Sequence, residues 1–225
     1  MVKTILFEIH HLYYWPNFLP IIEELIKRGN YIIHISTPNR NSKKEENILR
    51  ELCSKIPVQF IQENSEVNRT RKIIENRYDI IIIGNIGKIN KIASEKSIVV
   101  MVYHGIGLKQ SYYNDINDRI DLRAVESSDR YDELVNKGYN NLVLTGYTKL
   151  DRLYTLKDNE INLHQNSLDL NLSKKTILYA PSFYPTSIEK IAPFISVLSQ
   201  DFNVIIKLHG FSWEQKRFRY QSELC

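Results

Sequence analysis

The sequence predicts an α/β fold in which a mainly parallel sheet is flanked by helices. Short apolar runs of strand length alternate with longer segments of helical period through most of the 225 residues. Strands this apolar need cover on both faces, which is typical of parallel sheets with helices on either side. A hydrophobic fraction of 43% and a charged fraction of 25% are ordinary for a soluble globular chain. We therefore expect a Rossmann-like N-terminal domain.

The elements of this first domain follow in order along the chain. Strands are predicted at residues 4–9, 31–36, 58–61, 80–83, 98–103 and 142–145. Between the first two strands, residues 16–28 place apolar side chains on a helical period, and Gly29 is expected to end that helix. This alternation predicts one α/β domain over residues 1–156.

The rest of the chain predicts a linker and a second, smaller domain. Residues 157–175 are polar and rich in asparagine, with no apolar period, and are interpreted as the linker. A strand at 176–180, a helix at 187–199 and a strand at 202–207 then predict a second Rossmann-like domain over residues 176–225. About 50 residues cannot bury both faces of a sheet. We therefore expect this domain to be incomplete, either because the chain is truncated or because a companion chain or self-association completes it.

Charge and cysteine content limit the class of protein. A formal net charge of +4 and a pI near 8.9 permit anionic ligands but do not select them, and no nucleic-acid-reading module accompanies the short basic stretch at 216–219, so no nucleic-acid partner is expected. The two cysteines, Cys53 and Cys225, have no metal-ligand spacing and favour a reducing cytoplasm. With neither a signal peptide nor a membrane span in the sequence, any membrane contact is expected to be peripheral, at the inner face. No metal and no cofactor are expected.

Two histidine motifs follow apolar runs. His104-Gly105 comes after the run 98–103, and Lys207-Leu208-His209-Gly210 comes after the run 204–206. Ligands of open α/β sheets bind at the carboxyl ends of the strands, so two imidazoles placed there by separate domains are expected to converge on one substrate. A single histidine after a strand is more often structural, but the neighbouring glycines allow the backbone to approach a ligand closely. The pair predicts an enzyme.

Five motifs in this order carry a family resemblance. They are His104-Gly105-x-x-x-Lys109, Ser128-Asp129-x-Tyr131, Gly146-Tyr147-x-Lys149-x-Asp151-x-Leu153, Ile177-Leu178-Tyr179-Ala180-Pro181-Ser182-Phe183 and Lys207-Leu208-His209. The series resembles the CDP-glycerol glycerophosphotransferase family of teichoic acid primases and polymerases. The resemblance implies a GT-B-like fold with an acceptor-side domain at residues 1–156 and a donor-side domain at 176–225. It also implies transfer of glycerol phosphate, or a related alcohol phosphate, from a CDP-activated donor to a hydroxyl of a lipid-linked or polymer acceptor of the cell envelope, with release of CMP.

The resemblance also assigns residues. It makes His104 and His209 the catalytic histidines, since a hydroxyl that attacks phosphorus needs a base and the pyrophosphate needs hydrogen-bond donors. His104 is assigned as the base and His209 as the phosphate contact, although the reverse is equally allowed. Donor binding is assigned to Gly105, Lys109, Pro181, Ser182, Lys207 and Gly210. The family continues past its Lys-Leu-His motif into further βα units, which have no counterpart in this sequence.

The segment after the first strand predicts acceptor binding by His10, His11 and Trp15. Aromatic side chains there are suited to stacking on a sugar or a lipid head group, and the alternative is that they pack as a hydrophobic cover over the helix start. His34, inside a strand, is interpreted as structural.

Two other functions remain open on the sequence. One is a GT-B glycosyltransferase or a sugar-nucleotide epimerase-like enzyme, in which a nucleotide sugar replaces CDP-glycerol. The other is a non-catalytic partner subunit, which the short second domain favours.

Overall fold

A computed structural model describes residues 2–38, 43–103, 105, 117–182, 186–209 and 212. The chain forms two compact units that divide between Thr155 and Leu156. Among the helices of the described ranges, none has the length and apolarity needed to cross a membrane.

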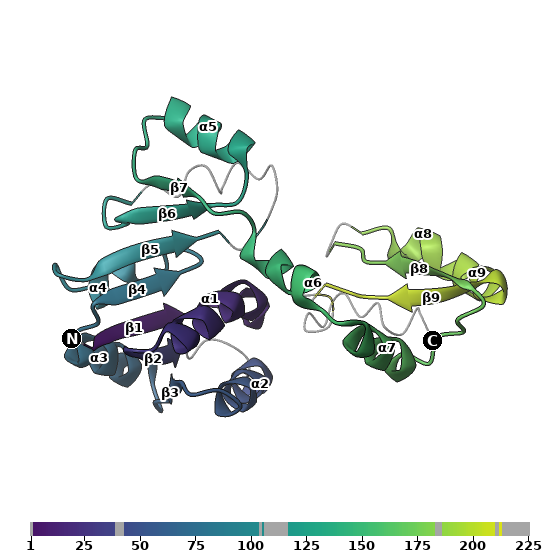
Figure 1. Ribbon diagram of the computed structural model, residues 1–225, viewed down its shortest axis with the longest axis horizontal. Coiled ribbons are helices and arrows are strands. Elements are labelled where there is room, and N and C mark those ends of the chain that lie inside the picture. The colour runs from purple at the N-terminus through teal and green to yellow at the C-terminus, as the bar shows by residue number, and fades with distance from the viewer. Residues whose placement is uncertain are drawn as a thin grey trace. The chain divides into compact units, whose positions relative to one another are not determined.

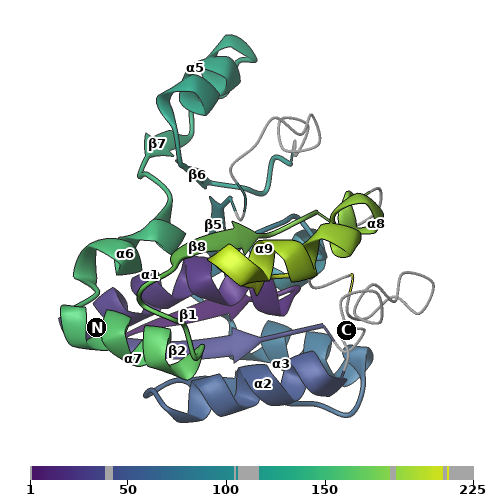
Figure 2. The ribbon, with the colours of Figure 1, turned by 90° about the vertical axis from the view of Figure 1, so that its right-hand side faces the viewer.

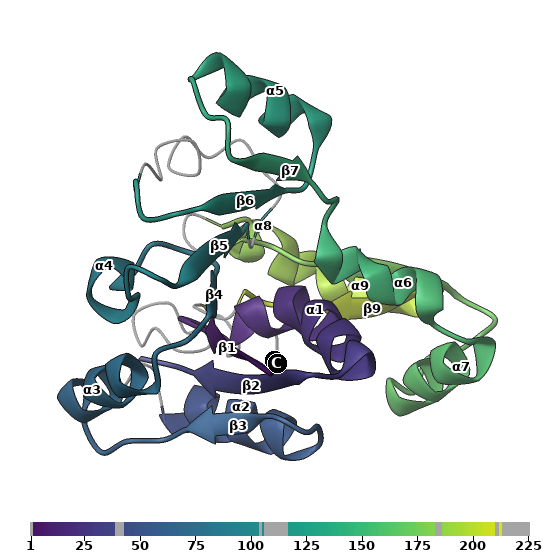
Figure 3. The same ribbon diagram turned by 60° about the vertical axis from the view of Figure 1, so that its left-hand side comes forward.

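The first unit contains one sheet of seven parallel strands (Figure 1). The strands are β1 (Lys3–Glu8), β2 (Tyr31–Ser36), β3 (Gln59–Ile61), β4 (Ile80–Ile83), β5 (Ile98–Val102), β6 (Leu122–Val125) and β7 (Leu142–Leu144). Their order across the sheet is β3-β2-β1-β4-β5-β6-β7, which Figure 3 shows from one edge to the other. The chain runs outward from β1 to β3 and then returns to build the other half from β4. This doubly wound arrangement confirms the predicted parallel α/β fold.

Helices cover both faces of this sheet. They are α1 (Trp15–Arg28), α2 (Lys43–Ser54), α3 (Glu66–Asn76), α4 (Ile89–Ile92) and α5 (Ser128–Asn136). The unit also contains the exposed helix α6 (Asp151–Thr155) and the 3-10 turns η1 (Leu12–Tyr14) and η3 (Thr148–Leu150). Helix α1 ends at Gly29, as predicted, and this glycine has φ of +70°. The hydroxyl of Thr148 in η3 donates to the carbonyl of Asn17 in α1 at 2.7 Å, so the end of the unit is fastened to its first helix.

Alternate side chains of β1, β4 and β5 fill two separate cores. Phe7 of β1 packs with Phe18 on the face covered by α1 and α2. Leu6, the preceding residue, lies in the core on the opposite face, together with Ile73 of α3 and Leu134 of α5. Because successive side chains of a strand point to opposite faces, the continuous apolar runs of the sequence serve both cores at once.

Strand β6 is the element of the sheet that the sequence did not predict. It is four residues long, and Arg123 interrupts its apolar run. The arginine is nevertheless buried, because its guanidinium lies over the ring of Tyr139, 5.0 Å from the centroid, and donates to the hydroxyl of Tyr103 at 3.2 Å.

The second unit is built around a two-stranded parallel sheet. It contains α7 (Asp158–Ser167), β8 (Lys175–Tyr179), α8 (Ile188–Ile191), η4 (Ala192–Phe194), α9 (Ile195–Asp201) and β9 (Phe202–Ile206). Figures 1 and 2 show α8 and α9 beside the strands, and Ile188 and Leu208 are buried there against Tyr179 and Ile206. The predicted single helix at 187–199 is broken at Pro193, which removes a backbone donor. Part of the predicted linker forms α7, a polar helix none of whose residues is buried.

Candidate functional site

The carboxyl ends of the seven strands of the first unit gather at one edge of its sheet. All six neighbouring pairs are parallel, so the segments after β1, β4, β5 and β6 start from the same edge. The direction in which successive strands are added to the sheet reverses between β1 and β4. Open α/β sheets bind their ligands at this kind of switch point. The candidate site is therefore built from the segments that follow these strands.

The segment after β1 carries the three predicted acceptor residues. His10 is 2% exposed, and Trp15, the first residue of α1, is buried in the core. His11 is partly exposed; its ring stacks on Tyr13 with centroids 5.2 Å apart, and its Nδ1 lies 3.9 Å from a carboxylate oxygen of Glu45. The burial of Trp15 agrees with the alternative that this aromatic segment covers the helix start. His11 is the most accessible of the three, and acceptor binding stays a prediction.

The segment after β4 contains a Gly84-x-x-Gly87 motif that the sequence analysis did not single out. A Cβ added at Gly84 would lie 2.8 Å from the ring of Tyr14, and one added at Gly87 would overlap the ring of His10. Asn85, between the two glycines, donates to the Tyr14 hydroxyl at 2.8 Å. Two glycines after an apolar run are the signal that would have indicated this close approach. The motif brings the β1 and β4 segments into contact at the switch point.

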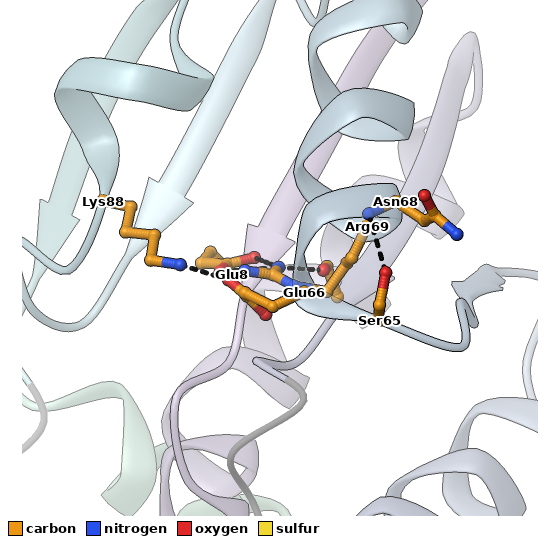
Figure 4. A network of polar contacts seen from close by, with 7 residues as sticks. Glu8, Ser65, Glu66, Asn68, Arg69 and Lys88 are labelled. Carbon is orange, nitrogen blue, oxygen red and sulfur yellow. Dashed lines mark hydrogen bonds and ion pairs between the residues drawn. The ribbon is translucent and has the colours of Figure 1, made fainter.

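A buried ion pair supports the same edge (Figure 4). The side chain of Arg69 in α3 is 1% exposed and that of Glu8, at the end of β1, is 3% exposed. Nη1 of the arginine donates to both carboxylate oxygens of Glu8, at 2.8 and 2.9 Å, and to the hydroxyl of Ser36 at 2.6 Å. Its Nε and Nη2 donate to Glu66, which also accepts from Lys88 at 2.9 Å. The network joins β1, β2, α3 and the segment after β4.

Two cationic and two anionic side chains make this network electrically balanced. Burial raises the pKa of the Glu8 carboxyl above its ordinary value of 4.5, although the neighbouring Arg69 acts in the opposite direction. Because the guanidinium already donates to Glu8, Ser36 and Glu66, we assign the network to support of the edge rather than to substrate contact.

A second buried pair lies where β5 and β6 end. Arg130 of α5 is 2% exposed, and its Nε lies 2.8 Å from a carboxylate oxygen of Glu126, which is 5% exposed. The same guanidinium lies over the ring of Tyr103, 4.7 Å from the centroid, and donates to the carbonyl of Gly105 at 3.4 Å. This pair therefore reaches the residues on both sides of the predicted catalytic His104.

The predicted residues of the first motif are only partly placed. Gly105 is described and contacts Arg130, whereas His104 and Lys109 lie outside the described residues. Gly210 of the last motif also lies outside them.

In the second unit, the structure brings the other predicted donor residues to one sheet edge. Strands β8 and β9 are paired in parallel up to Tyr179 and Ile206, so the segments that follow them start side by side. Lys207 donates its backbone N–H to the carbonyl of Tyr179 at 2.9 Å. Pro181 and Ser182 follow β8, and His209 follows β9; Ser182 and Lys207 are exposed and His209 is half-buried. Their contact with a donor stays a prediction.

Two other titratable side chains, those of the half-buried His34 and the buried Cys53, lie within the fold of the first unit. His34 in β2 shares a hydrogen bond of 2.6 Å with the Tyr78 hydroxyl, and burial lowers the pKa of the imidazole below 6.5. Burial raises the pKa of the Cys53 thiol to about 12. In the part of the chain that the structure describes, no group of three His, Cys, Asp or Glu side chains is arranged to hold a metal ion.

The two units define a GT-B-like α/β protein of Rossmann type. No protein-family model matches the sequence, and no curated protein matches it. Solved structures are similar at low identity. The S. aureus MnaA–UDP structure is 15% identical, with a TM-score of 0.61, and the match covers 97% of this chain and 65% of that one. UDP-GlcNAc 2-epimerase from Neisseria meningitidis, bound to UDP-GlcNAc, is 16% identical, with a TM-score of 0.60 and coverages of 98% and 69%.

A glycosyltransferase from Rickettsia africae is 15% identical, with a TM-score of 0.55 and coverages of 99% and 65%. The chain thus spans 65% of the length of two of these structures and 69% of the third. At these identities the likeness establishes the fold.

Proposed function

We propose that this chain belongs to a GT-B enzyme that acts on a nucleotide-activated donor. The observation that carries the proposal is the gathering of polar segments at the carboxyl edge of each parallel sheet, where α/β proteins bind their ligands. The fold is shared with structures whose names include UDP and UDP-GlcNAc, which favours a nucleotide sugar as the donor. The reaction class is then epimerisation or glycosyl transfer.

Transfer from CDP-glycerol is the second candidate. The five ordered motifs favour it, and two of them, the first and the second, are joined by the contact between Arg130 and Gly105. In either reaction a base near neutral pKa and donors to the developing phosphate charge are needed, and His104 and His209 are proposed for these roles.

Donor binding tests the proposal directly. Saturation-transfer NMR on the full chain would compare UDP, UDP-GlcNAc, CDP-glycerol and an unrelated purine nucleotide. We expect binding of a pyrimidine nucleotide donor, with UDP-GlcNAc ahead of CDP-glycerol if the nucleotide-sugar proposal holds and the reverse order if the second candidate holds. His209→Ala should weaken that binding at least tenfold. His164→Ala, on the exposed surface of α7, is the matched control.

Turnover is the second measurement. Release of UDP or CMP from the donor that binds, or conversion of a bound nucleotide sugar to its epimer, should fall in His104→Ala and His209→Ala. Failure of every pyrimidine donor to bind would contradict the proposed function and leave the non-catalytic partner subunit as the remaining interpretation.

A further inference from the structure

We propose that Arg130 is a positioning residue that fixes the main chain on both sides of position 104. The inference rests on the proposed function for its catalytic consequence. Its structural content, an anchor of Tyr103 and Gly105, is independent of which donor the protein uses.

Local sequence places Arg130 where it acts. Strand β6 ends at Val125, and Ser127 caps α5 by accepting the backbone N–H of Arg130 at 3.3 Å. The arginine therefore lies in the first turn of a helix that starts at the carboxyl edge of the sheet, next to the end of β5. The parallel pairing of β5 with β6 brings the Tyr103–Gly105 segment to the same place.

One partner fixes the guanidinium of Arg130, and the guanidinium in turn contacts two groups near position 104. Glu126 fixes the Nε side at 2.8 Å. The face of the guanidinium covers the Tyr103 ring, and Nη2 donates to the Gly105 carbonyl. Tyr103 is fixed a second time, since its hydroxyl accepts from the buried Arg123. Two arginines from neighbouring elements thus hold one tyrosine.

Stability alone is a poor explanation for this arrangement. A buried ion pair is often no more stabilising than apolar side chains of the same volume, because both charges lose their hydration. Gly105, by contrast, has no side chain to limit its backbone, so the main chain there needs an external restraint if a neighbouring side chain is to be held in a reactive orientation. The planar fork of an arginine supplies such a restraint, and a lysine ammonium does not.

The test uses selective labelling. The chain has eight glycines, so ¹⁵N-glycine labelling gives a simple amide spectrum in which Gly105→Ala identifies the Gly105 signal. Arg130→Lys should move or broaden that signal. Arg69→Lys removes an equally buried guanidinium fork that contacts Glu8, Ser36 and Glu66, and should leave the Gly105 signal unchanged.

Catalysis supplies the second readout. With the donor that binds, Arg130→Lys should lower kcat by roughly 10- to 100-fold, the range expected from a displacement of about 1 Å, and change KM less than threefold. An unchanged Gly105 signal in a folded Arg130→Lys variant overturns the proposal. If that variant does not fold, Glu126→Gln replaces it and must move the same signal. A shifted Gly105 signal in a protein that turns over no donor would sustain the anchor while contradicting the proposed function.

Discussion

Replacing Gly87 by alanine should destabilise the protein by two separable effects. The residue has φ of +48°, a left-handed conformation that costs a residue with a Cβ about 1–2 kcal/mol. The new Cβ would also lie 2.6 Å from Cε1 of His10 and closer still to its Nε2, and forcing atoms into a packed site costs about 1–3 kcal/mol. Because His10 is 2% exposed, its ring has little room to turn away. We expect a total loss of about 2–5 kcal/mol from the sum of these terms.

Urea unfolding at constant m-value measures this loss, and a second glycine separates its two parts. Gly146 has φ of +78°, and nothing lies within 4 Å of an added Cβ, so Gly146→Ala should lose the conformational term alone. In a His10→Ala background the cost of Gly87→Ala should fall toward the Gly146→Ala value, which a double-mutant cycle reports as coupling. Equal losses for the two glycines in the wild-type background, or no coupling to His10, would refute the close approach of the β1 and β4 segments.

Three further outcomes are expected. Arg69→Met leaves the carboxylate of Glu8 buried without its partner and should cost about 3–5 kcal/mol in urea unfolding; a loss near zero would contradict the pairing. Burial holds the pKa of His34 below 6.5, so as the pH falls below 6.5 the unfolded chain takes up the proton first and the folded state loses stability. The urea midpoint of the wild-type protein should therefore be lower at pH 5.5 than at pH 7.5, and His34→Gln should remove this part of the difference. In a Cys225→Ser background, the buried Cys53 should react with a thiol reagent at pH 8 only after urea is added, and fast labelling of the folded protein would contradict its burial.

The strands predicted for the first sheet are short segments rich in apolar residues. Strands β1, β2, β4 and β5 each have runs of Ile, Leu, Val or Phe long enough to stand out, and α1 has both an apolar period and a glycine stop. Strand β6 lacks such a run, because Arg123 takes a core position. Its buried guanidinium is stabilised by Tyr103 and Tyr139, which are distant from it in sequence. A pattern based on hydrophobicity cannot detect a cation that becomes acceptable only in the folded state.

The residues of the candidate site likewise divide into those with a local signal in the sequence and those without one. Residues at strand ends, such as His10 and Lys207, were placed at the sheet edges from the sequence, because the end of an apolar run is a local signal. The pair of Glu8 and Arg69 has no local signal, since the two residues are 61 positions apart and meet through the pairing of β1 with its neighbours. The anchor of Gly105 by Arg130 is likewise a product of the parallel register of β5 and β6.

The hydrogen bond from Thr148 to Asn17 sets a minimum time for the first unit to finish folding during synthesis on the ribosome. The two residues are 131 positions apart, and the central pairing of β1 with β4 already requires Ile80 to meet Ile5. At a synthesis rate of about 5–20 residues per second, roughly 7–26 s pass between the translation of the two ends of this contact. In the first part of that interval, until β4 has been translated, β1 lacks one of its two neighbouring strands, so the nascent chain offers apolar segments to chaperones.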